Sequence, residues 1–184
     1  MRLPRGLWAL TAVCAAAIAL TTGCGGGDGD DASATDEWAS SVCTAVDSWR
    51  TSVDAAADAI QADPTREGIQ EAADDLTTAT EKLVDDLNGL GRPETEAGQE
   101  AQESVDALTN ELEQSVTTME NAVDDASGAS GILNAVSVIS GNLVTMGQSV
   151  TSTLTSIQEL EGADELRQAF EQADSCANLG NPSS

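Results

Sequence analysis

The chain has 184 residues, enough for one domain with a buried core. Aromatic residues make up 2% and histidine and tyrosine are absent, so a core must be aliphatic and alanine-rich, which favours packed helices over a β-sandwich. The formal net charge of −25 repels phosphate backbones and argues against nucleic-acid binding. It also repels anionic lipid headgroups, so membrane attachment would need a covalent or apolar anchor.

Residues 1–23 have the pattern of a secretory signal peptide. Arg2 and Arg5 form a basic start, and an apolar run from Leu7 to Leu20 follows. This run of 14 residues is too short for an ordinary membrane-spanning helix but typical of a signal peptide. The pattern predicts export from the cytoplasm and removal of this segment.

The end of this segment carries a second pattern, Leu20-Thr21-Thr22-Gly23-Cys24. It resembles the lipobox of bacterial lipoproteins, although Thr21 stands where that family usually has an aliphatic residue. The resemblance implies cleavage between Gly23 and Cys24, lipid attachment to Cys24, and a place on the extracytoplasmic face of the cell membrane. Two acyl chains would anchor the chain firmly. The alternative is cleavage by the ordinary signal peptidase, which leaves Cys24 as a spare thiol.

Residues 24–35 are rich in glycine and aspartate and have no apolar periodicity, which predicts a flexible tether. Asp28, Asp30 and Asp31 lack the later glycine and glutamate of an EF-hand loop. We therefore expect a solvated spacer here and no calcium site.

Residues 36–180 form one predicted domain, and residues 181–184 a tail. Apolar residues recur at alternating steps of three and four, which predicts an all-α antiparallel bundle of four to five helices. A capping Thr35 begins the first helix and Asp63-Pro64 ends it. Further helices are expected from Pro64 to about Leu90, from about Glu94 to beyond Val123, from Ile132 to Leu160, and over a short stretch from Asp164 to Cys176.

The predicted fourth helix differs from the others because no charged residue lies between Asp125 and Glu159. Its many serine, threonine, asparagine and glutamine residues argue against a transmembrane helix. One interpretation is a helix surrounded by its neighbours, with Gly141 and Gly147 allowing close approach. The other is an uncharged face open to a protein partner or a second copy, with Ser149 as an exposed position for testing it.

Two cysteines are left once Cys14 departs with the signal peptide and Cys24 is assigned to lipid. In an exported chain, Cys43 and Cys176 would most simply form one disulfide, the alternative being two free buried thiols. If the first and fifth helices run antiparallel, that bond also places Trp49 against Phe170.

The sequence lacks residue types that several catalytic mechanisms need. Without histidine, imidazole bases and most zinc sites are absent, and paired cysteines leave no thiol nucleophile. The acid pairs Asp74-Asp75 and Asp85-Asp86 are interpreted as a solvated face and not as a metal site. The sequence thus predicts no enzyme and no cofactor.

Two hypotheses about function follow. The first is a membrane-anchored, non-enzymatic interaction or structural module of the cell envelope. The second is a helical bundle that binds or senses a small ligand or cations. Residues 36–179 also resemble acidic, alanine-rich helical proteins that high-GC Gram-positive bacteria secrete, but this resemblance rests on composition and transfers no functional residues.

Overall fold

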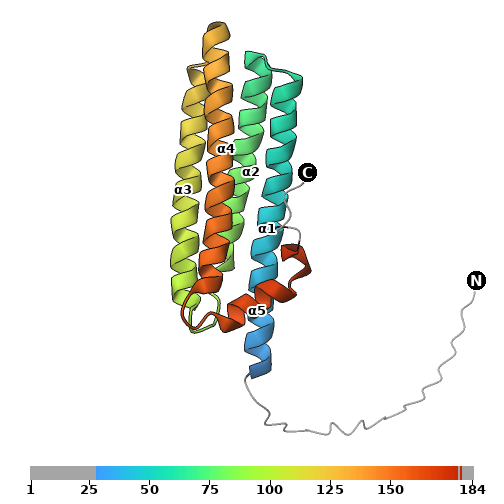
Figure 1. Ribbon diagram of the computed structural model, residues 1–184, viewed down its shortest axis with the longest axis vertical. Coiled ribbons are helices and arrows are strands. Elements are labelled where there is room, and N and C mark those ends of the chain that lie inside the picture. Colours follow the sequence, from blue (N-terminus) through green and yellow to red (C-terminus); the bar gives the residue numbers. More distant parts are fainter. Residues whose placement is uncertain (1–27, 178, 180–184) are drawn as a thin grey trace, which may run out of the picture.

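A computed structural model describes residues 28–177 and residue 179 (Figure 1). Four long antiparallel helices form a bundle: α1 Asp28–Ala62, α2 Arg66–Leu90, α3 Gly98–Asp124 and α4 Gly128–Glu159. A short helix α5, Asp164–Gln172, and a 3-10 turn η1, Asp174–Cys176, follow. The described residues contain no strand. The predicted all-α antiparallel bundle is confirmed.

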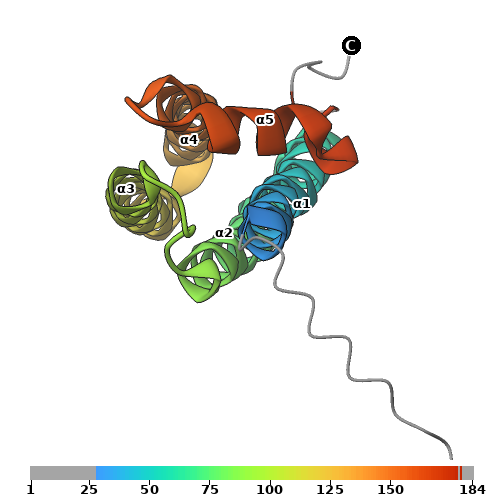
Figure 2. The same cartoon turned by 90° about the horizontal axis from the view of Figure 1, so that it is seen from below.

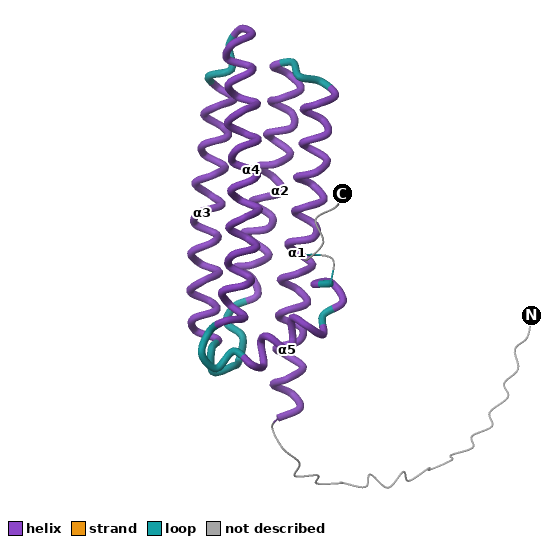
Figure 3. The backbone as a smooth tube through the Cα atoms, viewed as in Figure 1, coloured by secondary structure: helices purple, strands orange, loops and turns teal. Residues whose placement is uncertain are grey.

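Short connections join the long helices, as the tube in Figure 3 shows. Thr65 caps α2, because its side-chain oxygen accepts a hydrogen bond from the backbone N–H of Gly68 at 3.2 Å. Gly162 turns the chain between α4 and α5 with φ at 75°, a left-handed conformation that favours glycine. These short loops make each long helix antiparallel to the next along the chain.

Four helices begin at residues other than those predicted. α2 begins at Arg66, after its cap Thr65, and not at Pro64. α1 begins at Asp28, so the predicted tether is helical from that residue onward, and the first turns of α1 project beyond the end of the bundle (Figure 1). α3 begins at Gly98 and not near Glu94, because successive turn hydrogen bonds occupy the backbone between Pro93 and Gly98. α4 begins at Gly128, four residues before Ile132, because the turn that connects it to α3 is shorter than predicted.

One hydrophobic cluster runs through the bundle and reaches α5. Its large, fully buried members come from all four long helices and from α5, and include Val42, Leu76, Leu112, Ile139 and Leu166. Each lies on the apolar stripe of its helix, so burial of these stripes holds the helices together.

The four helices form a ring with one loosely closed side. Viewed from the end, the ring runs α1, α2, α3, α4, and α5 lies across the side between α4 and α1 (Figure 2). Neighbouring pairs pack along their lengths except α1 and α4, which touch over a short stretch. The side between α1 and α4 is therefore held mainly by α5, which contacts both helices, while η1 packs on α1 and α5.

Candidate functional site

The residues assigned to membrane anchoring cannot be placed. The predicted signal peptide, the cleavage position between Gly23 and Cys24, and the lipid-bearing Cys24 lie outside the described residues. The anchor therefore stays a prediction from the sequence.

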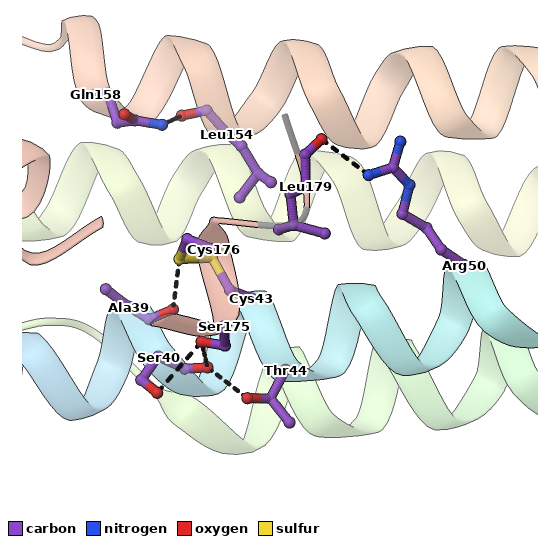
Figure 4. Close-up of a disulfide and its surroundings, with 10 residues drawn as sticks. All are labelled: Ala39, Ser40, Cys43, Thr44, Arg50, Leu154, Gln158, Ser175, Cys176 and Leu179. Carbon is purple, nitrogen blue, oxygen red and sulfur yellow. Dashed lines mark hydrogen bonds between the residues drawn. A yellow bond between two sulfur atoms is a disulfide. The ribbon is translucent and has the colours of Figure 1, made fainter. Parts of the chain in front are cut away.

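Cys43 and Cys176 form a disulfide, with Cα atoms 5.0 Å apart. The bond joins the middle of α1 to η1, as Figure 4 shows. Cys43 is 1% exposed, so the link lies against the core. Next to it, Ser175 Oγ donates a hydrogen bond to the backbone oxygen of Ser40 at 3.1 Å. The predicted disulfide is confirmed.

The aromatic pairing expected from this disulfide is wrong. Phe170 packs edge-on against Trp38, with ring centroids 5.9 Å apart, whereas Trp49 donates from Nε1 to Thr80 Oγ1 at 3.1 Å. The expectation required an antiparallel fifth helix. Four antiparallel helices return the chain to the end where α1 begins, so the segment from Phe170 to Cys176 advances in the same direction as α1 (Figure 1).

A groove of about 250 Å³ opens on the loosely closed side of the ring, between α1 and α4. Its floor consists of four buried apolar side chains, Val46, Trp49, Val150 and Phe170. The disulfide lies beside this floor. The remaining lining residues are half-buried or exposed: Arg50, Gly147, Thr151, Leu154, Thr155, Gln158, Glu171 and Leu179. The groove combines an apolar base with a polar rim.

Arg50 is the one basic residue that lines this groove. Its Nη1 donates to the backbone oxygen of Leu179 at 2.9 Å, and in Figure 4 Leu179 lies between the ribbons of α1 and α4. Within residues 28–177 and 179 the guanidinium forms no salt bridge, although the chain contains 32 acidic residues. Arg50 thus keeps N–H groups for a further acceptor.

The outer face of α4 is a second candidate site. We define it as six exposed residues at helical spacing, Leu133, Ser137, Gly141, Val144, Gln148 and Ser152. Leu133 is 71% exposed and Val144 is 61% exposed, although both are large and apolar. The interpretation of α4 as a helix surrounded by neighbours is therefore wrong for this face.

Two details predicted for α4 also differ. A Cβ placed at Gly141 or Gly147 meets nothing within 4 Å, so neither glycine serves close packing inside the described chain. Ser149 is half-buried and donates to Glu111 Oε1 at 2.7 Å, which makes it part of the contact with α3. An acid at Ser149 would disturb that contact and would not report on the outer face.

By length and composition, α4 is the one described helix apolar enough to cross a membrane, with a mean hydropathy of 1.3 over its most apolar window. However, α4 packs along α3, and the exposed Glu111 of α3 accepts a hydrogen bond from Ser149 of α4. Carboxylates beside a membrane-spanning helix would be costly to bury in lipid. The packing therefore favours α4 as a helix of the bundle.

Acidic residues also line a groove between α2 and α3, namely Glu81, Asp85, Glu113 and Glu120. Across the described part of the chain, no group of three or more His, Cys, Asp or Glu residues could hold a metal ion. Of the acid pairs on α2, Asp74, Asp75 and Asp85 are exposed and Asp86 is half-buried.

The groove between α1 and α4 was not predicted from the sequence. Its lining comes from residues more than 90 positions apart, and the separation of α1 from α4 depends on how α5 crosses the bundle. The signal in the sequence was Arg50 directly beside the stripe residue Trp49, in a chain with few bases.

No protein-family model, curated protein or solved structure matches this chain.

Proposed function

We propose that the chain is a membrane-anchored, extracytoplasmic and non-enzymatic interaction module of the cell envelope. The lipobox-like Leu20–Cys24 supports the anchor, with the lipid on Cys24. The observation that carries the interaction is the outer face of α4, which is exposed, uncharged and partly apolar. The centres of protein interfaces are likewise depleted in charge.

The charge of the molecule favours a second copy as the partner. A basic partner would gain most by docking on α2 or α3, whose exposed positions carry many carboxylates. An acidic partner is repelled there and meets no acid on the outer face of α4. Another copy, anchored in the same membrane, is an acidic partner at high effective concentration.

Energy transfer between two fluorescently labelled pools of the lipidated protein, mixed in liposomes, tests this contact. We expect transfer above the level of random proximity for the unsubstituted protein. Val144→Glu should abolish the excess, because it places facing carboxylates in the contact. Thr118→Glu adds the same charge at an exposed position of α3 and should keep the excess. Two results would contradict self-association through α4. One is energy transfer at the random level for the unsubstituted protein, and the other is equal transfer for Val144→Glu and Thr118→Glu.

Metabolic labelling with palmitate tests the anchor separately. Label should enter the unsubstituted protein and be absent from Cys24→Ala, since the predicted acceptor sulfur is gone. Label retained by Cys24→Ala would rule out lipidation at this cysteine.

A further inference from the structure

We infer that the groove between α1 and α4 binds a small amphipathic carboxylate, with its apolar chain on the groove floor and its carboxylate paired with Arg50. This binding site is separate from the outer face of α4 and extends the proposed function to a small-molecule ligand. The chemistry of the floor, the size of the groove and the state of Arg50 each restrict the ligand.

The floor selects an apolar group. Val46, Val150 and Phe170 have no polar side-chain atoms and lie buried beneath the groove. Trp49 has one polar atom, Nε1, and it is already bonded to Thr80. The floor therefore offers no free donor or acceptor, and an apolar chain placed on it would lose no hydrogen bond.

The volume sets the size of the ligand. At about 250 Å³ the groove is smaller than the roughly 300–1,000 Å³ of drug-sized ligand pockets. A water molecule occupies about 30 Å³ in the liquid, so the groove accommodates a ligand of about eight to ten non-hydrogen atoms. This size fits a short-chain carboxylate and excludes a whole phospholipid.

Arg50 selects an anionic head group. Its guanidinium has five N–H groups in a plane, and the described residues accept from one of them, through the oxygen of Leu179. A carboxylate can take two of the others in the bidentate geometry that arginine favours. Glu171 is the one acid that lines the groove; it is exposed and forms no salt bridge with Arg50.

The described acids around Arg50 leave its guanidinium without a salt bridge. At physiological salt, screening acts over about 8 Å, so exposed carboxylates on α2 and on the far side of α3 contribute little at the groove. The wall of α4 contributes no charge at all, since Thr151, Thr155 and Gln158 are neutral. On α1 itself, the exposed Asp47 and Asp54 lie three and four residues from Arg50. Together with Glu171 they are the acids that a bound carboxylate would meet, and none of the three forms a salt bridge with Arg50.

Calorimetric titration with octanoate tests the inference. The protein is the full chain carrying Cys24→Ser, because removal of the predicted lipid allows work without detergent, which would compete for the groove. We expect saturable binding of octanoate to one site. Arg50→Gln should weaken it at least tenfold, since hydrogen bonds between charged groups contribute about 1.5–3 kcal/mol. The matched control is Arg66→Gln, which makes the same charge change at an exposed position of α2 and should leave the affinity unchanged.

Octan-1-ol separates the apolar contribution from the charge. It should bind more weakly than octanoate and be insensitive to Arg50→Gln. Gly147→Leu, at a position that lines the groove, should prevent binding of both molecules by filling the space above the floor. Gly141→Leu, on the outer face of the same helix, should leave both affinities unchanged.

Three results would overturn the inference. The first is no saturable binding of octanoate to a chain that thermal melting shows to be folded. The second is equal octanoate affinity in Arg50→Gln and the unsubstituted chain, which would remove the head-group assignment. The third is unchanged binding in Gly147→Leu, which would place the ligand outside the groove.

Discussion

The hydrogen bond between Trp49 and Thr80 joins two buried side chains across α1 and α2. We expect Thr80→Val to lower the free energy of unfolding by about 1–3 kcal/mol, because valine keeps the shape of threonine but leaves the indole N–H without an acceptor. Urea denaturation followed by circular dichroism measures this change.

Thr78→Val provides the control. Thr78 is exposed on the same helix and bonds to the backbone of Asp74, so its replacement should change stability by less than about 0.5 kcal/mol. Equal effects of Thr78→Val and Thr80→Val would mean that the cost comes from helix propensity and not from the lost acceptor.

Burial of individual residues was predictable where it follows from helical periodicity. Val42 and Trp49 are seven residues apart and Leu76 and Thr80 are four apart, which is the spacing of helical turns, and all four are buried. The surroundings of Arg50 were not predictable, because they depend on α4 and on the segment that ends at Leu179, both distant in sequence. Periodicity indicates which side of a helix faces inward but not which other helix lies opposite.

At the scale of the elements, two glycines should respond to alanine in opposite directions. Gly141→Ala should raise the free energy of unfolding by about 0.5–1 kcal/mol, because alanine is the better helix former and its Cβ meets nothing within 4 Å. Gly162→Ala should lower it by about 1–2 kcal/mol, since φ is 75° and its Cβ would approach the Glu96 side chain to 3.0 Å. Parallel urea titrations compare the two variants; stabilisation by both would contradict the turn conformation of Gly162.

The number and order of the elements could be predicted, but their ends and the path of the last one could not. α1 extends back to Asp28 through a Gly/Asp-rich segment with low helix propensity, against the local signal. The direction after α4 follows from counting: an even number of antiparallel helices ends where the first begins. Applied to the sequence, that rule predicts that the segment from Phe170 to Cys176 runs parallel to α1. A parallel segment does not place Trp49 against Phe170.

At the scale of the molecule, acidic residues are distributed unevenly around the bundle. α1, α2 and α3 expose carboxylates along their lengths, whereas α4 exposes none before Glu159. An isolated soluble domain gains nothing from leaving one helix uncharged, since like charges spread over more surface repel one another less. The distribution is consistent with the proposed contact along α4, and Cys24 is separated from the start of α1 by three residues.

The disulfide constrains almost the whole domain, because Cys43 and Cys176 are 133 positions apart. In the chain-entropy model, closure of a loop this long stabilises the folded state by up to about 5 kcal/mol. That is comparable to the total stability of a modest domain. The double variant Cys43→Ala/Cys176→Ala should therefore melt about 10–20 °C below the unsubstituted protein, measured by scanning calorimetry.

Reductant separates the bond from the side chains. Dithiothreitol should lower the melting temperature of the unsubstituted protein by a similar amount and leave that of the double variant unchanged. Equal melting temperatures of the reduced and oxidised proteins would contradict this. They would mean that packing of Trp38 against Phe170 and the other contacts of α5 hold the end of the chain without the disulfide. A fall in two separate steps would instead indicate that the segment after α4 opens before the four-helix ring unfolds, because that segment closes the side between α1 and α4.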